Sequence, residues 1–186
     1  MSKTRPAVFL DRDGTLMEEV HYCSDPARVR VFPGASDALR GLMERGFLTV
    51  IVTNQSGIGR GLLDHRQYEA VQAELLRQLG ASLISATYCC PDLPPSPQRK
   101  PEPVMVFEAA RDLGIDLARS WFVGDKSVDI ECGRRAGVRT ILVRTGYGAR
   151  EYRHEIKPDY VAKDIVAAAS FILENGDAKS HDQRND

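Results

Sequence analysis

Two aspartates near the N-terminus, Asp11 and Asp13, have the residue type and spacing for phosphate and metal chemistry. They follow the apolar run Ala7–Leu10, which predicts a buried strand of a parallel sheet. Ligands of such sheets bind beyond the carboxyl ends of the strands. One carboxylate at that edge can attack phosphorus while the other handles the proton of the leaving group. The alternative is a plain acidic turn, which Gly14 would also favour.

A second polar segment, Thr53-Asn54-Gln55-Ser56-Gly57, follows the apolar run Leu48–Val52. Its hydroxyl groups, its amides and the backbone N–H groups beside the glycine could together cradle phosphate oxygens at the end of a strand. An ordinary Ser/Thr or Asx turn that contains a glycine is the competing interpretation. The position of the segment after a second strand favours the phosphate-binding interpretation.

Two later segments supply a cation and another carboxylate. Lys100, in Arg99-Lys100-Pro101, could neutralise a phosphoryl group during transfer, although most lysines are simply solvated. Asp125, after the apolar segment 121–123, could complete a Mg²⁺ site with Asp11 and the backbone carbonyl of Asp13, because Mg²⁺ prefers hard oxygen ligands. Asp129 either supports this site or caps the next helix.

Strand-like and helical patterns alternate along the chain, which predicts an α/β fold: a Rossmann-like open parallel sheet with helices on both faces. The expected strands are Ala7–Leu10, Phe47–Val52, Leu83–Tyr88, Trp121–Val123, Thr140–Val143 and, with a weaker pattern, Tyr160–Ala162. The expected helices are Ala35–Arg45, Asp64–Leu79, Glu102–Leu113 and Val128–Ala136. Gly46, Gly114 and Gly137 directly follow the first, third and fourth of these ranges, as is common at helix ends.

The composition is that of an ordinary globular protein. The chain has 186 residues, 42% of them hydrophobic and 27% charged, with a net charge of −1. The length predicts one domain over residues 1–175, and the polar end of the chain, which lacks periodicity, predicts a disordered tail at 176–186. The near-neutral charge and the lack of a long apolar run argue against nucleic-acid and membrane partners. Four cysteines without disulfide-type spacing predict reduced thiols in a cytoplasmic protein, which we expect to be a monomer.

We expect an open active site without a separate cap domain. The roughly twenty residues between the first strand and Pro33 suffice only for a small flap. The segment 89–101, which contains Cys89 and Cys90 and is rich in proline, is expected to be a stiff, non-helical loop. Loops, and not a cap domain, should therefore contact the substrate.

The order of these motifs, D-x-D-G-T, T-N after a strand, a lysine and then G-D-x-x-x-D, resembles that of the haloacid dehalogenase (HAD) superfamily of aspartyl-phosphate phosphotransferases. The resemblance covers about residues 6–170. It is closer to the capless histidinol-phosphate and heptose-bisphosphate phosphatases, through Phe9–Thr15, Val52–Gly61, Arg99–Pro101, Val123–Lys126 and Leu142–Gly146.

The resemblance implies a role for each matching residue. Asp11 would be the nucleophile and Asp13 the general acid and base, with Lys100 as the third catalytic residue. Mg²⁺ would bind Asp11, Asp13 and Asp125. Substrate would contact the three motif residues Asp11, Arg12 and Asp13, the flap residues Glu19, Val20, His21 and Tyr22, the phosphate loop Thr53, Asn54, Gln55 and Ser56, and the basic residues Arg60, Arg99, Lys100 and Lys126.

One departure from the family pattern concerns zinc. Members of this family usually hold a structural zinc with three cysteines and one histidine in the loop before the Arg-Lys pair. Here that segment offers only Cys89 and Cys90 and no histidine. A closed structural site needs four ligands, so we predict no structural zinc.

The resemblance implies that the chain removes the 7-phosphate of D-glycero-D-manno-heptose 1,7-bisphosphate, in the biosynthesis of ADP- or GDP-heptose. Arg60 and Arg99 are then the sequence candidates for holding the second phosphate. Histidinol phosphate is the alternative substrate. A polynucleotide 3′-phosphatase shares the T-N-Q-x-G-I-G-R-G motif, but the near-neutral charge disfavours it. A non-catalytic phosphate-binding module is a further alternative, although the nucleophile is present.

Overall fold

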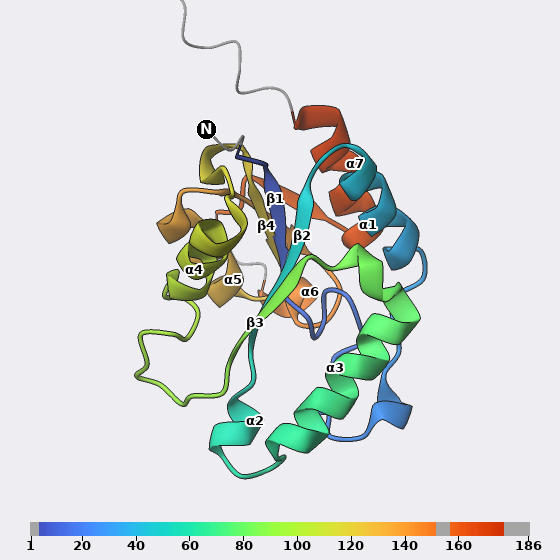
Figure 1. Cartoon of the computed structure of the whole chain (residues 1–186), viewed down its shortest axis with the longest axis vertical. Helices are drawn as coiled ribbons and strands as arrows, with labels where there is room; N and C mark the ends of the chain where they lie inside the picture. Colours follow the sequence, from blue (N-terminus) through green and yellow to red (C-terminus); the bar gives the residue numbers. More distant parts are fainter. Residues whose placement is uncertain (1–3, 152–156, 177–186) are drawn as a thin grey trace, which may run out of the picture.

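The computed structural model, which describes residues 4–151 and 157–176, is built around a six-stranded parallel sheet with the strand order β3-β2-β1-β4-β5-β6. The chain crosses from one half of the sheet to the other between β3 and β4, on the two sides of β1 (Figure 1). The strands are β1 (Ala7–Leu10), β2 (Leu48–Asn54), β3 (Ala86–Cys90), β4 (Trp121–Gly124), β5 (Arg139–Val143) and β6 (Tyr160–Ala162).

Helices cover both faces of the sheet because its strands are apolar on both sides. Val8 and Leu10 join one buried cluster, while Ala7 and Phe9 join the other. The first cluster packs against α1 (Ala35–Glu44), α3 (His65–Leu79) and α7 (Ile165–Asn175). The second packs against α4 (Val104–Leu113) and α5 (Ser127–Ala136), on the opposite side of the sheet in Figure 1. A continuous apolar strand of this kind is typical of parallel sheets.

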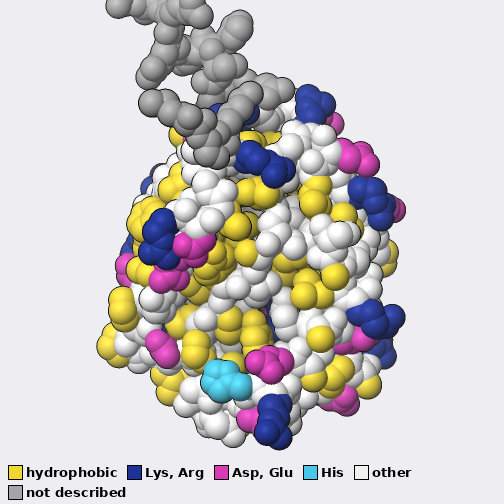
Figure 2. All heavy atoms as spheres, viewed as in Figure 1, with side chains coloured by type: hydrophobic (Ala, Val, Ile, Leu, Met, Phe, Trp, Pro, Cys, Tyr) yellow, Lys and Arg dark blue, Asp and Glu magenta, His cyan; other side chains and the backbone are white. Residues whose placement is uncertain are grey.

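The connections include short helices. These are α2 (Ser56–Gly59), α6 (Gly148–Glu151) and the 3₁₀ turns η1 (Pro26–Arg28), η2 (Ala81–Leu83) and η3 (Leu117–Arg119). None of the helices in the described ranges is both long and apolar enough to cross a bilayer. Acidic and basic side chains are interspersed on the face shown in Figure 2, as the small net charge suggests.

The predicted α/β fold is confirmed, and two of its elements need correction. β3 was expected at Leu83–Tyr88 but spans Ala86–Cys90. Leu83 belongs to η2 instead, and the pairing of β3 with β2 begins at Ala86, opposite Val50. Cys89 and Cys90 are consequently strand residues and do not belong to the loop.

The second correction is α7, which the sequence pattern did not suggest. Asp164 caps this helix by accepting a hydrogen bond from the Ala167 N–H at 2.8 Å. The helix also reaches Asn175, where the ordered part of the domain was expected to end. Residues 177–186 of the expected tail lie outside the described residues.

Candidate active site

The polar segments predicted from the sequence meet at the carboxyl edge of the sheet. Asp11 directly follows β1, and its N–H donates to the carbonyl of Val123 in β4 at 3.0 Å. Because β1 lies between β2 and β4, the segments that follow all three strands come together there. A cavity of about 250 Å³ opens at this edge, lined by Asp11, Asp13, Glu19, Val20, His21, Tyr22, Cys23, Thr53, Asn54, Gln55, Ser56, Gly57, Arg99, Lys100, Lys126, Val128, Asp129 and Tyr147.

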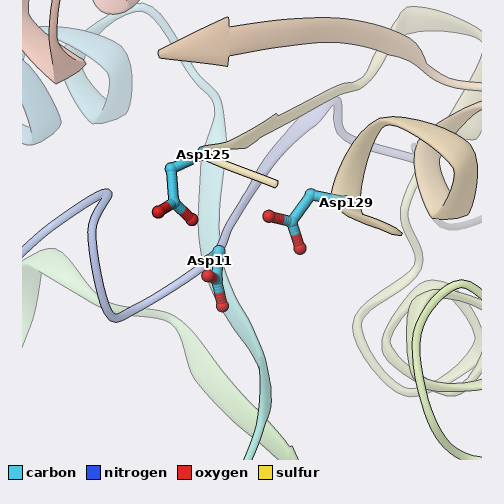
Figure 3. A group of neighbouring side chains, drawn as sticks. All are labelled: Asp11, Asp125 and Asp129. Carbon is cyan, nitrogen blue, oxygen red and sulfur yellow. The ribbon is translucent and has the colours of Figure 1, made fainter. Parts of the chain in front are cut away.

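Three buried carboxylates form a cluster at this edge of the sheet, and two of them, Asp11 and Asp129, line the cavity. Asp11 comes from the end of β1, Asp125 from the end of β4 and Asp129 from the first turn of α5 (Figure 3). One oxygen of each lies within 4.8 Å of the others. Asp129 therefore belongs to the cluster itself, and it also caps α5 by accepting a hydrogen bond from the Lys126 N–H at 3.0 Å.

The carboxylate of Asp125 is held in a fixed orientation. Its Oδ2 accepts a hydrogen bond from the Tyr147 N–H at 2.8 Å. Gly14 and Gly146 close around the same oxygen, since a Cβ atom on either residue would lie 2.2 Å from it. The other oxygen, Oδ1, is buried without a hydrogen-bond partner among the described residues. This free oxygen in a cluster of hard carboxylate donors fits a divalent cation such as Mg²⁺.

Lys100 is buried against the cluster. Its Nζ lies 2.8 Å from Asp11 Oδ1, 2.7 Å from Asp129 Oδ1 and 2.7 Å from the carbonyl oxygen of Val52. Only 2% of its side chain is exposed, so its charge is compensated almost entirely by these oxygens. The sequence placed Lys100 in the site, and the structure shows that it bridges two of the three carboxylates.

The charges at this site shift the pKa values of its groups in opposite directions. Burial alone would raise the pKa of Asp11, but Lys100 and Lys126 outweigh burial and lower it. Burial, aided by the neighbouring charge of Asp11, raises the pKa of Asp125 to about 8. Burial also raises the pKa of Asp129 to about 6, although Lys100 opposes this. Asp11 is thus the carboxylate held most firmly in its ionised form.

Asp13 lines the cavity, but its side chain is not part of the carboxylate cluster. Arg12 binds both of its oxygens, with Nε 2.9 Å from Oδ2 and Nη2 3.1 Å from Oδ1. Gln55 Nε2 donates to Oδ2 at 2.8 Å. Arg12 itself is 1% exposed and is absent from the cavity lining, so a contact between Arg12 and substrate stays a prediction.

The flap expected after the first strand forms part of the cavity wall. All four of its predicted contact residues, Glu19, Val20, His21 and Tyr22, line the cavity. Glu19 Oε2 pairs with Lys126 Nζ at 3.0 Å, and Lys126 Nζ lies 4.6 Å from the centre of the Tyr147 ring. Tyr147 was not predicted as a site residue, because only its place after the Thr145-Gly146 turn brings it to the cavity.

All four residues of the predicted phosphate loop, Thr53, Asn54, Gln55 and Ser56, line the cavity. Gln55 Nε2 also donates to Thr53 Oγ1 at 2.9 Å, and the side chain of Asn54 bonds to the backbone of Lys100. The hydroxyl groups of Thr53 and Ser56 could donate to the oxygens of a phosphate bound in this cavity.

The two arginines proposed for a second phosphate are placed differently. Arg99 lines the cavity, and its Nη1 donates to the carbonyl of Asp92 at 3.1 Å. Arg60 is exposed at the end of α2 and is not a lining residue, so the structure does not bring it into the site.

The segment between β3 and Arg99 holds neither of the two cysteines considered as zinc ligands. Cys89 and Cys90 are residues of β3, and Cys90 is fully buried. All four cysteines of the chain are unpaired thiols. The loop 91–99 therefore contains no thiol or imidazole ligand of its own.

Comparison with known proteins identifies the family. A HAD-hydrolase-like family model matches residues 98–168. The D-glycero-D-manno-heptose-1,7-bisphosphate 7-phosphatase of Thermosynechococcus vestitus is 39% identical over 188 residues, which cover 90% of this chain and 95% of that protein. The D-glycero-beta-D-manno-heptose-1,7-bisphosphate 7-phosphatase of Yersinia pestis is 38% identical over 186 residues, with 93% and 92% covered.

A solved structure agrees with these relatives. The D,D-heptose 1,7-bisphosphate phosphatase from B. bronchiseptica, crystallised with magnesium and phosphate, superimposes with a TM-score of 0.82 at 30% identity. The match covers 91% of this chain and 99% of that one. The chain therefore belongs to the D-glycero-D-manno-heptose-1,7-bisphosphate 7-phosphatase family of HAD-like hydrolases.

Proposed function

We propose that this chain is a Mg²⁺-dependent phosphatase that forms an aspartyl phosphate on Asp11 and removes the 7-phosphate of D-glycero-D-manno-heptose 1,7-bisphosphate. The observation that carries the proposal is the arrangement around Asp11. This buried carboxylate lines the cavity, bound to Lys100 and next to two further carboxylates. The names of the relatives support the substrate.

Asp11 is suited to act as the nucleophile. Lys100 and Lys126 lower its pKa, so it is ionised at neutral pH. Lys100 occupies Oδ1, which leaves Oδ2 for in-line attack on phosphorus. The P–O bond to the sugar then breaks, and the phosphoryl group is transferred to Asp11.

Asp13 is suited to move the proton. It lines the same cavity two residues further along the chain. In the first step it would protonate the departing sugar alkoxide, and in the second it would accept a proton from the water that attacks the aspartyl phosphate. The products are the dephosphorylated sugar and inorganic phosphate, with Asp11 restored.

The cavity supplies groups for the three outer phosphate oxygens. Thr53 and Ser56 provide hydroxyl groups, and Lys100 provides a buried positive charge. Asp11, Asp125 and the backbone carbonyl of Asp13 would hold Mg²⁺, with Asp129 beside them. When bound, the ion would neutralise charge on the phosphoryl group. Most of the catalysis would thus come from positioning and charge, as is usual for phosphoryl transfer.

Arg99 is the residue best placed for the second phosphate of a bisphosphate. It lines the cavity, and a guanidinium binds phosphate through paired hydrogen bonds.

We further propose that residues 1–175 form one catalytic domain and that the protein acts as a monomer in the cytoplasm. Size-exclusion chromatography with light scattering would check the oligomeric state.

A phosphate-release assay tests the proposed activity. The purified protein is incubated with Mg²⁺ and, separately, with heptose 1,7-bisphosphate, histidinol phosphate and a 3′-phosphorylated oligonucleotide. We expect the highest kcat/KM for the bisphosphate and none of this activity in Asp11→Asn, whose amide is a poor nucleophile. A preference for histidinol phosphate would contradict the proposed substrate. Turnover by Asp11→Asn in a clean preparation would contradict the nucleophile.

A further inference from the structure

We propose that Arg12 is a positioning residue that clamps the carboxylate of Asp13 and keeps it apart from the cation site, so that Asp13 remains available for proton transfer. The inference rests on the proposed function, because it assigns Arg12 a part in that reaction. It begins from an anomaly of the site: Arg12 is 1% exposed and fully charged, yet it does not reach the cavity where substrate would bind.

The hydrogen bonds of Arg12 show where its charge is used. Nε and Nη2 grip the two oxygens of Asp13 side by side, at 2.9 and 3.1 Å. Such a paired contact fixes the plane of a carboxylate as well as its position. The third donor to Asp13 is Gln55 Nε2, at 2.8 Å. Three donors therefore determine how a single carboxylate lies in the cavity.

The surroundings of Arg12 hold the clamp itself in place. Its guanidinium carbon lies 5.4 Å from the centre of the Tyr68 ring, which belongs to α3. A cation above an aromatic face is stabilised by the ring, most strongly where water is excluded. Gln55 is anchored in turn, because its N–H donates to the carbonyl of Cys90 at 2.7 Å. The clamp is thus fixed from α3 on one side and from the end of β3 on the other.

The clamp keeps the carboxylate of Asp13 away from that of Asp11, although the two residues are close in sequence. Asp11, Asp125 and Asp129 gather their oxygens within 4.8 Å, while the side chain of Asp13 stays outside that cluster. A free carboxylate two residues from Asp11 would be a ready additional ligand for a hard cation. Because Arg12 fixes the plane of the Asp13 carboxylate, it holds this side chain outside the cluster. Lysine could not do the same, because a point charge lacks the planar fork.

The test compares leaving groups. Protonation by Asp13 matters for a sugar alkoxide but hardly for p-nitrophenolate, which departs as a stable anion. In Arg12→Met we expect kcat/KM for the sugar bisphosphate to fall by about 100-fold, on the scale of general acid–base catalysis. The value for p-nitrophenyl phosphate should change little. Arg12→Lys should lie between Arg12→Met and the wild type for the bisphosphate.

The controls exclude a merely structural role. Arg111→Met removes an exposed arginine that also pairs with the next residue, Asp112, and should leave both substrates unaffected. Calorimetric titration with Mg²⁺ should show that Arg12→Met binds the ion at least as tightly as wild type. If Arg12→Met does not fold, Arg12→Lys, which keeps the buried charge but lacks the paired donors, should show the same preference for the better leaving group.

Equal losses with both substrates, or weaker Mg²⁺ binding by Arg12→Met, would overturn the inference, because Arg12 would then support the fold or the cation site. Unchanged kcat/KM for the bisphosphate would overturn it too. The proposed function fails in a different way: the wild-type protein would then hydrolyse neither ester, and the role of Arg12 would fall with it.

Discussion

The side chain of Asn54 is bonded to the backbone of Lys100 at both of its polar atoms. Nδ2 donates to the Lys100 carbonyl at 3.1 Å, and Oδ1 accepts from the Lys100 N–H at 3.0 Å. The last residue of β2 thereby fixes the loop that carries the buried lysine, and Lys100 Nζ reaches Asp11 at 2.8 Å. The Thr-Asn motif thus positions the cation of the site as well as bordering the cavity.

This relationship predicts the effect of Asn54→Ala. With both hydrogen bonds lost, Lys100 should be displaced from Asp11, and a misplacement of this kind costs on the order of 100-fold in kcat. Stability should fall by about 1–3 kcal/mol, because buried backbone groups lose their partners. Steady-state kinetics and urea denaturation measure the two effects. Asn175→Ala, which removes a hydrogen bond to Phe171 at the end of α7, is the control and should keep full activity. Wild-type kcat in Asn54→Ala would contradict the positioning role.

Gly146 is predicted to be required for the orientation of Asp125. A Cβ atom at this position would lie 2.2 Å from Asp125 Oδ2, so Gly146→Ala should displace that carboxylate and weaken Mg²⁺ binding and activity together. Gly137→Ala is the matched control: its φ is also positive, +75° against +55°, but nothing lies within 4 Å of the added atom. Both variants should lose about 1–2 kcal/mol from backbone strain. Calorimetric titration with Mg²⁺ separates them, and equal affinities in both variants would rule out the steric account.

The raised pKa values of the cluster predict how the metal-free protein responds to pH. The pKa of Asp125 in the folded protein is about 8, against an ordinary value of 3.8. Folding therefore favours its protonated form, and the stability gained at low pH is lost as the pH rises through about 8. Mg²⁺ competes with this proton, so its affinity should rise with pH up to the same value.

Thermal melting with EDTA and with Mg²⁺ at about pH 6 and about pH 9 checks both statements. Without metal, melting should occur at a lower temperature at the higher pH, and Mg²⁺ should stabilise the protein more there. Asp125→Asn, which cannot titrate, should lose most of this pH dependence. A Mg²⁺ effect that is the same at both pH values in the wild-type protein would show that no proton is displaced.

Arg99 and Arg60 provide a test of how the second phosphate of the substrate is bound. Arg99 lines the cavity, so Arg99→Ala should cost about 1.5–3 kcal/mol in kcat/KM for a sugar bisphosphate, the scale of a hydrogen bond to a charged group. A monophosphate should be affected much less. Arg60 is exposed outside the cavity, and Arg60→Ala should change neither value. Equal losses for both substrates in Arg99→Ala would instead show that Arg99 stabilises the loop, through its hydrogen bond to the carbonyl of Asp92.

Much of the site could be predicted because its residues directly follow apolar strands. Asp11 directly follows β1, Asn54 is the last residue of β2, and Asp125 directly follows β4, so the parallel sheet alone brings them to one edge. The strand boundary that was predicted wrongly depends on a competition between two local structures, a strand and a 3₁₀ turn. Leu83 is apolar enough for a strand, but the 3₁₀ turn after Gly80 takes it up.

The roles that were missed depend on tertiary contacts. Arg12 shares a motif with Asp11 and Asp13, yet its side chain turns to the interior beside Tyr68, fifty-six positions later in the chain. Tyr147 lies beside the cavity after the Thr145-Gly146 turn, and its N–H bonds to Asp125. Neither contact leaves a periodic or compositional signal, so a single sequence does not indicate it.

The central claim, an aspartyl phosphate on Asp11, is tested most directly by mass spectrometry of acid-quenched Asp13→Asn protein after mixing with p-nitrophenyl phosphate and Mg²⁺. This substrate needs little protonation to release its leaving group, whereas hydrolysis of the acyl phosphate needs a base that the variant lacks. One phosphoryl group should therefore accumulate on the peptide that contains Asp11, and the double variant Asp11→Asn/Asp13→Asn should carry none. A phosphoryl group on another residue, or release of p-nitrophenolate without any modified protein, would contradict the account.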